Sequence, residues 1–147
     1  MDTKKKLPGG IAKLAKILSH ADRRTEKKVL EGLRARSPKL ADKIRDRLVT
    51  FDDLAGMEDR TIQEVLRHLD SKKLALALRG ASADLLRKFL DNMSSRAGDM
   101  LTSEIEAIGP QPRSKIGEAQ QEIMRTLREL ESSGRISLTR PDDRYVE

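Results

Sequence analysis

Side chains that could perform acid–base or metal chemistry are sparse in this sequence. Its two histidines, His20 and His68, lie far apart without clustered acids, and cysteine is absent. Side-chain catalysis needs a nucleophile beside a base, paired carboxylates in a cleft, or a metal site. The stretches "PGG" and "RGA" are too poor in glycine to be phosphate loops. We therefore expect no enzymatic activity, no cofactor and no metal.

The chemistry that the sequence does offer is charge. The segment "RGASADLLRKFLDNMSSR", residues 79–96, has an arginine at each end and five large apolar residues between them. Arg79 and Arg96 thus stand at the two turns that flank one predicted helix. This placement by itself assigns them no role, and the alternative is that they are ordinary surface arginines.

Charge is also unevenly distributed along the chain. The 147 residues carry a formal net charge of +6. Residues 1–49 hold 15 Lys and Arg against 6 Asp and Glu, whereas residues 50–147 hold 15 against 18, so the two parts carry +9 and −3. A basic segment of this kind can meet nucleic acid, an anionic membrane surface or an acidic protein face. It can also be no more than a solvated surface.

DNA binding by the basic segment is the weaker of these interpretations. Residues 1–50 contain no aromatic side chain for stacking on bases. Acidic residues are also interleaved with the basic ones, instead of leaving one helix face uniformly positive for the major groove. These acids are Glu26, Glu31, Asp42 and Asp46. We therefore expect no nucleic-acid partner.

The composition favours an all-α fold. Aromatic residues make up only 2% of the chain, so the core must consist mainly of Leu, Ile, Ala, Val and Met. Charged and hydrophobic residues each make up 37%, which fits short amphipathic helices with solvated outer faces. No window approaches the length of a membrane-spanning helix, and "MDTKKKLPGG" lacks the apolar run of a secretion signal. A cytoplasmic protein is expected.

Apolar residues recur at helical spacing in eight stretches, and no stretch alternates as a strand does. Ser37 followed by Pro38 is a clear helix start, and Thr61 and Glu64 have the spacing of a capping box. Gly80 is expected to end a helix in the left-handed conformation. The expected helices cover residues 11–20, 22–36, 37–48, 58–70, 71–80, 82–93, 96–108 and 114–132.

The periodicity also predicts the domain organisation. Met93 and Met100 fall on apolar stripes and are expected in the core. The stretch "TFDDLAGM" breaks the helical period and is interpreted as a connector between two helical units. The predicted parts are an N-terminal tail with a Gly-Gly linker (1–10), an armadillo-like helical unit (11–48), the connector (49–58), a C-terminal helical bundle (59–137) and a tail (138–147).

Several separated motifs together resemble one protein family. They are "EDRTIQEVLRHLD", "LALALRGAS", "KFLDNMSSRAGDML" and "EAIGP", followed by "EAQQEIMRTLRELESSGRI". In this order they closely resemble the C-terminal part of the FliG family of flagellar rotor switch proteins. The upstream helices of residues 9–48 resemble the armadillo-type helices that precede it in that family.

The resemblance implies a component of the flagellar rotor, or switch complex, that receives torque and supports switching of rotation. It implies that charges on the helical bundle meet charges on the cytoplasmic loop of the stator protein MotA. It also implies FliM as a neighbour in the ring, and self-association through the armadillo-like unit. The protein would be cytoplasmic and peripheral, at the inner face of the membrane in the basal body.

The resemblance carries two arginines over with their charge. "ALRGA" corresponds to the family's "ALKGA", which places a positive charge at Arg79, and Arg96 matches the arginine of the family's "NMSxRA". We expect these two arginines at the same end of the bundle. Helical spacing places Arg96 on the outward side of its helix, with Glu104 at the edge of the apolar face.

Other positions depart from the family pattern. The family's pair of acids falls on Ser103 and Glu104, so one negative charge is lost, and "GPVR" becomes "GPQPR", which places Pro112 where the arginine stands and Arg113 one residue later. A Met-Phe-x-Phe hinge appears as "LVTF" and keeps only Phe51. These departures leave open a second hypothesis, a standalone FliG-like interaction protein without a motor role. A basic DNA-binding protein is the less favoured third.

The candidate residues follow from this correspondence. They are Arg79, Arg96, Glu104 and Arg113 for stator binding, and Gly9, Gly10 and Phe51 for linker and hinge.

Overall fold

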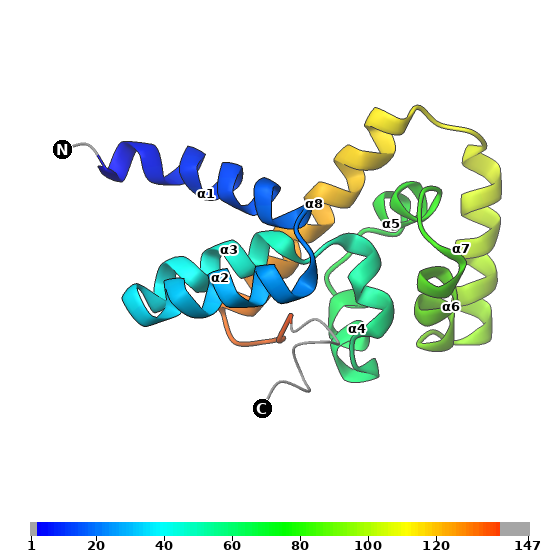
Figure 1. The fold of residues 1–147 in the computed structure, drawn as a ribbon. Helices are drawn as coiled ribbons and strands as arrows, with labels where there is room; N and C mark the ends of the chain where they lie inside the picture. Colours follow the sequence, from blue (N-terminus) through cyan, green and yellow to red (C-terminus); the bar gives the residue numbers. More distant parts are fainter. Residues whose placement is uncertain (1–2, 139–147) are drawn as a thin grey trace. The chain divides into compact units, whose positions relative to one another are not determined.

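The computed structural model describes the backbone of residues 3–138 and the side chains of residues 10–138 (Figure 1). Residues 139–147, most of the predicted tail, lie outside the described part. Within it the chain is all-α, as predicted, and contains no strand. The elements are α1 Thr3–Ser19, α2 Arg23–Arg36, α3 Pro38–Leu48, the 3₁₀ helix η1 Phe51–Gly56, α4 Asp59–Leu66, α5 Ser71–Leu78, α6 Ala83–Asp91, α7 Ser95–Ile108 and α8 Arg113–Ser132.

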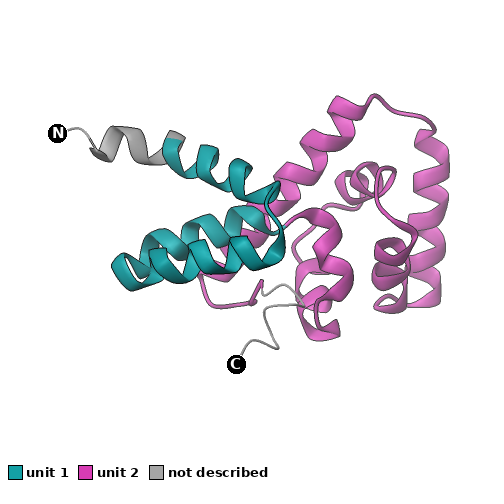
Figure 2. Cartoon of the chain, viewed as in Figure 1, with its two compact units in different colours: residues 1–49 teal, residues 50–147 magenta. Residues whose placement is uncertain are grey.

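The helices divide into two compact units. Unit 1 comprises Met1–Val49 and unit 2 comprises Thr50–Glu147 (Figure 2). Within the described part of the chain, no helix combines the length and the apolar composition of a membrane span.

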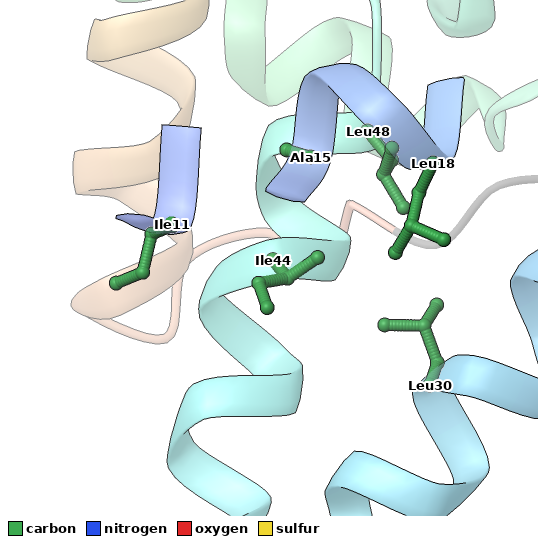
Figure 3. Packing of buried hydrophobic residues seen from close by; sticks show 6 residues of the cluster. All are labelled: Ile11, Ala15, Leu18, Leu30, Ile44 and Leu48. Atoms are coloured by element: carbon green, nitrogen blue, oxygen red, sulfur yellow. The ribbon is translucent and has the colours of Figure 1, made fainter. Parts of the chain in front are cut away.

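Unit 1 is a three-helix unit in which both α1 and α2 pack on α3. Its core is aliphatic, because the sequence offers no aromatic residue here. Ile44 of α3 is fully buried and faces residues from both other helices (Figure 3). The cluster consists of Ile11, Ala15, Leu18, Leu30, Ile44 and Leu48.

Helices α1 and α2 begin with different local features. Helix α1 begins at Thr3, so the backbone of Gly9 and Gly10 is helical and the predicted Gly-Gly linker is wrong for this structure. Two glycines lower helix propensity but do not forbid a helix. Asp22 caps α2 by accepting a 2.7 Å hydrogen bond from the amide of Thr25, which lowers the pKa of the Asp22 carboxyl.

The predicted start of α3 is confirmed. The Ser37 hydroxyl accepts a hydrogen bond from the amide of Leu40 at 3.3 Å, and Pro38 occupies the first helical position. Proline fits there because that amide has no intrahelical acceptor.

The segment predicted to be a connector belongs to the core of unit 2. Residues Phe51–Gly56 form η1, which begins with a capping box between Thr50 and Asp53. Phe51 and Leu54 are buried, and the ring of Phe51 stacks on that of Phe89 in α6 with centroids 6.4 Å apart. This short helix therefore positions α6, and Phe51 does not lie in an exposed linker.

Unit 2 is arranged around α5, which packs against both α7 and α8, while α4 packs on α6. Fully buried side chains of α4, α6, α8 and the segment after α8 contribute to the core of unit 2. They include Ile62, Val65, Leu85, Phe89, Ile123, Leu127 and Leu138.

Two local predictions in unit 2 are wrong. Helix α4 begins at Asp59 after Glu58, without a side-chain cap, and Thr61 is buried inside its first turn instead of capping it. Gly80 does not adopt positive φ. A Cβ atom there would lie 2.7 Å from Cγ2 of Ile116, so glycine is needed because α5 ends against α8.

Candidate partner-binding surface

Arg79 follows the last residue of α5 and is exposed. The end of α5 is fixed against α8 by the close approach of Gly80 to Ile116. A second contact is the side-chain amide of Gln120, which donates a 3.0 Å hydrogen bond to the carbonyl of Ala77. The backbone that carries Arg79 is therefore held in place while its guanidinium group faces solvent.

Arg113 is the first residue of α8 and is also exposed. It lies one helical turn before Ile116, the residue that contacts Gly80, so the structure brings Arg79 and Arg113 to the same end of α8. The first turn of α8 contains no acid, and Lys115 adds a further exposed positive charge. The positive end of the helix dipole has the same sign.

Arg96 is the second residue of α7, whose N-cap Ser94 accepts a 3.1 Å hydrogen bond from the amide of Ala97. Its side chain is exposed, as the helical spacing predicts. Arg79 precedes the first turn of α6 and Arg96 follows its last turn. The nine residues of α6 extend about 13 Å. The expectation that both arginines lie at one end of the bundle is therefore wrong.

The positions of the family's two acids lie in the middle of α7. Ser103 is exposed, whereas Glu104 is half-buried at the edge of the apolar face. Arg96 precedes Glu104 by two helical turns, which corresponds to about 12 Å along the helix axis. One exposed cation and one half-buried acid thus lie along α7.

None of the three candidate arginines forms an ion pair within 4.0 Å with any residue of the described part. Other cations of unit 2 are paired internally. Lys73 lies 2.9 Å from Glu122, and Lys88 lies 2.8 Å from Asp59. Arg79, Arg96 and Arg113 are therefore available to charges outside the unit.

A polar network joins α4 to α6 and was not predicted from the sequence. Asp59 Oδ1 accepts hydrogen bonds from Lys88 Nζ at 2.8 Å and from Asn92 Nδ2 at 3.1 Å. The side-chain amide of Gln63 donates to Asn92 Oδ1 at 3.0 Å. The hydrogen bonds from Lys88 and Asn92 lower the pKa of Asp59. Sequence spacing carries no signal for the network, because its partners lie on different helices.

A second contact between distant segments fixes the start of α6. Ser82 caps α6 by accepting from the amide of Leu85 at 3.2 Å, as its position predicts. Asp52 of η1 in turn accepts from the backbone amide of Ser82 at 3.2 Å. The turn between Arg79 and α6 is therefore fixed by one hydrogen bond to the first turn of α6 and one to η1.

The core prediction for Met100 is wrong. Its side chain is 64% exposed on α7, whereas Leu101 beside it is buried. Met93 is half-buried. Met100 lies at the margin of the apolar stripe, and α7 packs on α5 with the side that carries Leu101. Among the described side chains no group of three or more His, Asp or Glu residues could hold a metal ion.

The described part of the chain is thus an all-α protein with exposed arginines at helix ends that have no ion-pair partner within that part. Comparison with known families identifies the class of helical protein to which it belongs. Residues 31–138 match the family model described as "FliG C-terminal domain". The chain therefore belongs to this family, and the resemblance seen in its motifs is confirmed.

Curated relatives agree with this assignment. The chain is 46% identical over 132 residues to the flagellar motor switch protein FliG of Thermotoga maritima, covering 90% of this chain and 39% of that protein. It is 39% identical over 138 residues to FliG of Borreliella burgdorferi, covering 94% and 40%. The chain thus spans about two-fifths of the length of these relatives.

Solved structures show the same fold. The crystal structure of Helicobacter pylori FliG residues 116–343 in its own numbering matches with a TM-score of 0.76 at 30% identity, covering 88% of this chain and 57% of that one. Full-length FliG from Aquifex aeolicus matches with a TM-score of 0.62 at 35% identity, covering 87% and 40%.

Proposed function

We propose that this chain is a rotor-side component of the flagellar switch complex that receives torque through charged residues of unit 2. Family membership supports the motor role, and the observation that carries the surface is the exposure of Arg79, Arg96 and Arg113 without an ion-pair partner among the described residues. The role is non-enzymatic. The protein would be cytoplasmic and peripheral, at the inner face of the cell membrane in the flagellar basal body.

The proposed partner of this surface is the charged cytoplasmic loop of the stator protein MotA. The surface has two parts: Arg79 with Arg113 at the start of α8, and Arg96 with Glu104 along α7. An exposed ion pair contributes about 0.2 to 1 kcal/mol. Single contacts can therefore form and break during rotation, while several together set the register of approach. FliM and further copies of the chain, joined through unit 1, are the proposed neighbours in the ring.

Charge reversal tests the proposal. Arg79→Glu combined with Arg96→Glu should abolish or strongly reduce swimming in cells that still assemble flagella, because two attractions become repulsions. The purified double variant should also lose the salt-sensitive part of its binding to the MotA loop.

The matched control is Arg60→Glu with Arg125→Glu. Both residues are exposed in unit 2, are not among the candidate residues and produce the same change in net charge. Normal swimming of the Arg79 and Arg96 double variant, or an equal defect in the control, would contradict the proposal.

The exposure of Ser103 favours one alternative, a FliG-like interaction protein without a motor role. An acid is lost at this outward position of α7, and with it part of the charge pattern that the stator would read. A pull-down from cells that lack stators separates the two functions. A motor role predicts only switch components among the captured proteins, whereas the alternative predicts a partner unrelated to the flagellum.

A further inference from the structure

One exposed apolar side chain interrupts the charged side of α7. Met100 is 64% exposed, and Ile17 of unit 1, at 65%, is the only other large hydrophobic residue so exposed in the described part of the chain. Single exposed hydrophobic residues are common on protein surfaces. The position of Met100 distinguishes it, because it lies one helical turn after Arg96 and one turn before Glu104.

The neighbours of Met100 on the outward side of α7 are small or charged. Asp99, Ser103 and Ala107 are exposed, and Thr102 turns its hydroxyl back to donate to the carbonyl of Gly98 at 2.9 Å. Apart from Arg96 and Glu104, one helical turn to either side, no larger side chain of α7 therefore stands beside the Met100 thioether on this side. Methionine is unbranched and adapts its shape to a partner surface.

We propose that Met100 is the apolar anchor of the surface that contacts the stator. The occupant is a stator segment that presents an aliphatic or aromatic side chain to Met100, an acid to Arg96 and a base towards Glu104. The side chains of α7 follow the order cation, apolar residue, acid along about 12 Å of the helix. The stator segment would present the complementary order. The inference rests on the proposed function and adds a contact that does not depend on charge.

The physical distinction between the two kinds of contact is their response to salt. Added salt screens exposed ion pairs. Apolar burial is not screened, and sulfate strengthens it. A binding surface made of charges alone would lose nearly all affinity at high salt, whereas one with a buried methionine would keep a residual affinity that depends on that side chain.

The test is titration of the full chain with the purified MotA cytoplasmic loop at about 50 mM and about 500 mM sodium chloride. Met100→Gln keeps the length of the side chain and removes its apolar character. We expect it to raise Kd about tenfold at both salt concentrations, which corresponds to about 1.4 kcal/mol. Arg96→Glu should weaken binding strongly at low salt and much less at high salt.

Ile17→Gln is the matched control, because Ile17 is equally exposed but lies in unit 1. It should leave Kd within twofold of the native value. Circular dichroism of each variant should match that of the native chain, since neither side chain lies in a core.

Each of the other possible outcomes contradicts the anchor, the proposed function or the assignment of the stator as the partner. If Met100→Gln binds as the native chain does at both salt concentrations, the anchor is rejected while the charged surface stands. If the native chain does not bind the loop at all, the proposed function and the anchor fall together. If sedimentation shows a dimer that Met100→Gln dissociates, a second copy covers this residue and the stator assignment is wrong.

Discussion

Gly80 determines how closely two helices of unit 2 approach. The missing Cβ leaves room for Cγ2 of Ile116, and a hydrogen bond from the side-chain amide of Gln120 to the carbonyl of Ala77 joins the same two helices. The sequence suggested a different reason for the glycine, a left-handed helix end. The local sequence pattern identified Gly80 as a special position. The contact that requires glycine there comes from Ile116 of α8, which is distant in the chain.

Gly80→Ala should therefore destabilise unit 2. The added methyl group would lie 2.7 Å from Cγ2 of Ile116, which cannot rotate away as easily as the end of a long side chain. We expect a loss of about 1 to 3 kcal/mol in the free energy of unfolding, measured by urea denaturation.

Two further variants make this measurement specific. Gly117→Ala, one residue after Ile116, meets no atom within 4 Å and should stabilise the chain by about 0.5 to 1 kcal/mol. Ile116→Ala should remove most of the cost of Gly80→Ala in a double-mutant cycle. Equal effects of the Gly80 and Gly117 substitutions would show that the close approach is not the cause.

At the scale of elements, the α-helices after α1 were predictable and their packing was not. Ser37 with Pro38 and Ser82 are caps whose chemistry acts within four residues, so the sequence alone predicts them. Helix η1 was not predictable, because Phe51 is ordered by stacking on Phe89 of a distant helix. Arg96 was correctly placed outward by helical spacing, whereas its position relative to Arg79 depended on the direction of α6.

The network between α4 and α6 predicts a pH-dependent stability. Hydrogen bonding from Lys88 and Asn92 lowers the pKa of Asp59 in the folded chain. Its contribution to stability is therefore present above the unfolded pKa, about 3.9, and is lost as the pH falls through the lower folded value. Asp59→Asn should lower Tm at pH 6, and this difference should vanish towards pH 2.

Lys88→Met provides the reference for that experiment. In this background Asp59 lacks its main partner, so Asp59→Asn should change Tm much less at pH 6. A difference between native chain and Asp59→Asn that stays constant from pH 6 to pH 2 would contradict the assigned role of the carboxylate.

The whole molecule combines two units with unlike charge and separate cores. Unit 1 coincides with the segment of +9 charge and unit 2 with the segment of −3. The size of unit 1, about 49 residues, is close to the lower limit at which a hydrophobic core supports a fold. The basic character of the first segment and the end of its helical unit at residue 48 were visible in the sequence, whereas the membership of Phe51 in the core of unit 2 was set by packing.

Amide hydrogen exchange should show that unit 1 is less stable than unit 2. Amides of α2 and α3 should exchange faster than those of α8. Ile44→Ala, which removes a fully buried side chain of unit 1, costs about 2 to 5 kcal/mol and should raise exchange there. Ile123→Ala is the counterpart in unit 2 and should act on α5 and α8. Uniform changes along the chain in both variants would contradict separate cores.

The stacking of Phe51 on Phe89 also determines where a fragment for binding studies should begin. A fragment cut by helical periodicity, at residue 59, would discard the aromatic ring beneath α6 and the carboxylate that accepts from Ser82. The core of this shorter fragment would be partly exposed next to the turn that carries Arg79. A fragment that begins at or before Thr50 retains both, and differences in its affinity can then be attributed to the surface and not to a damaged interior.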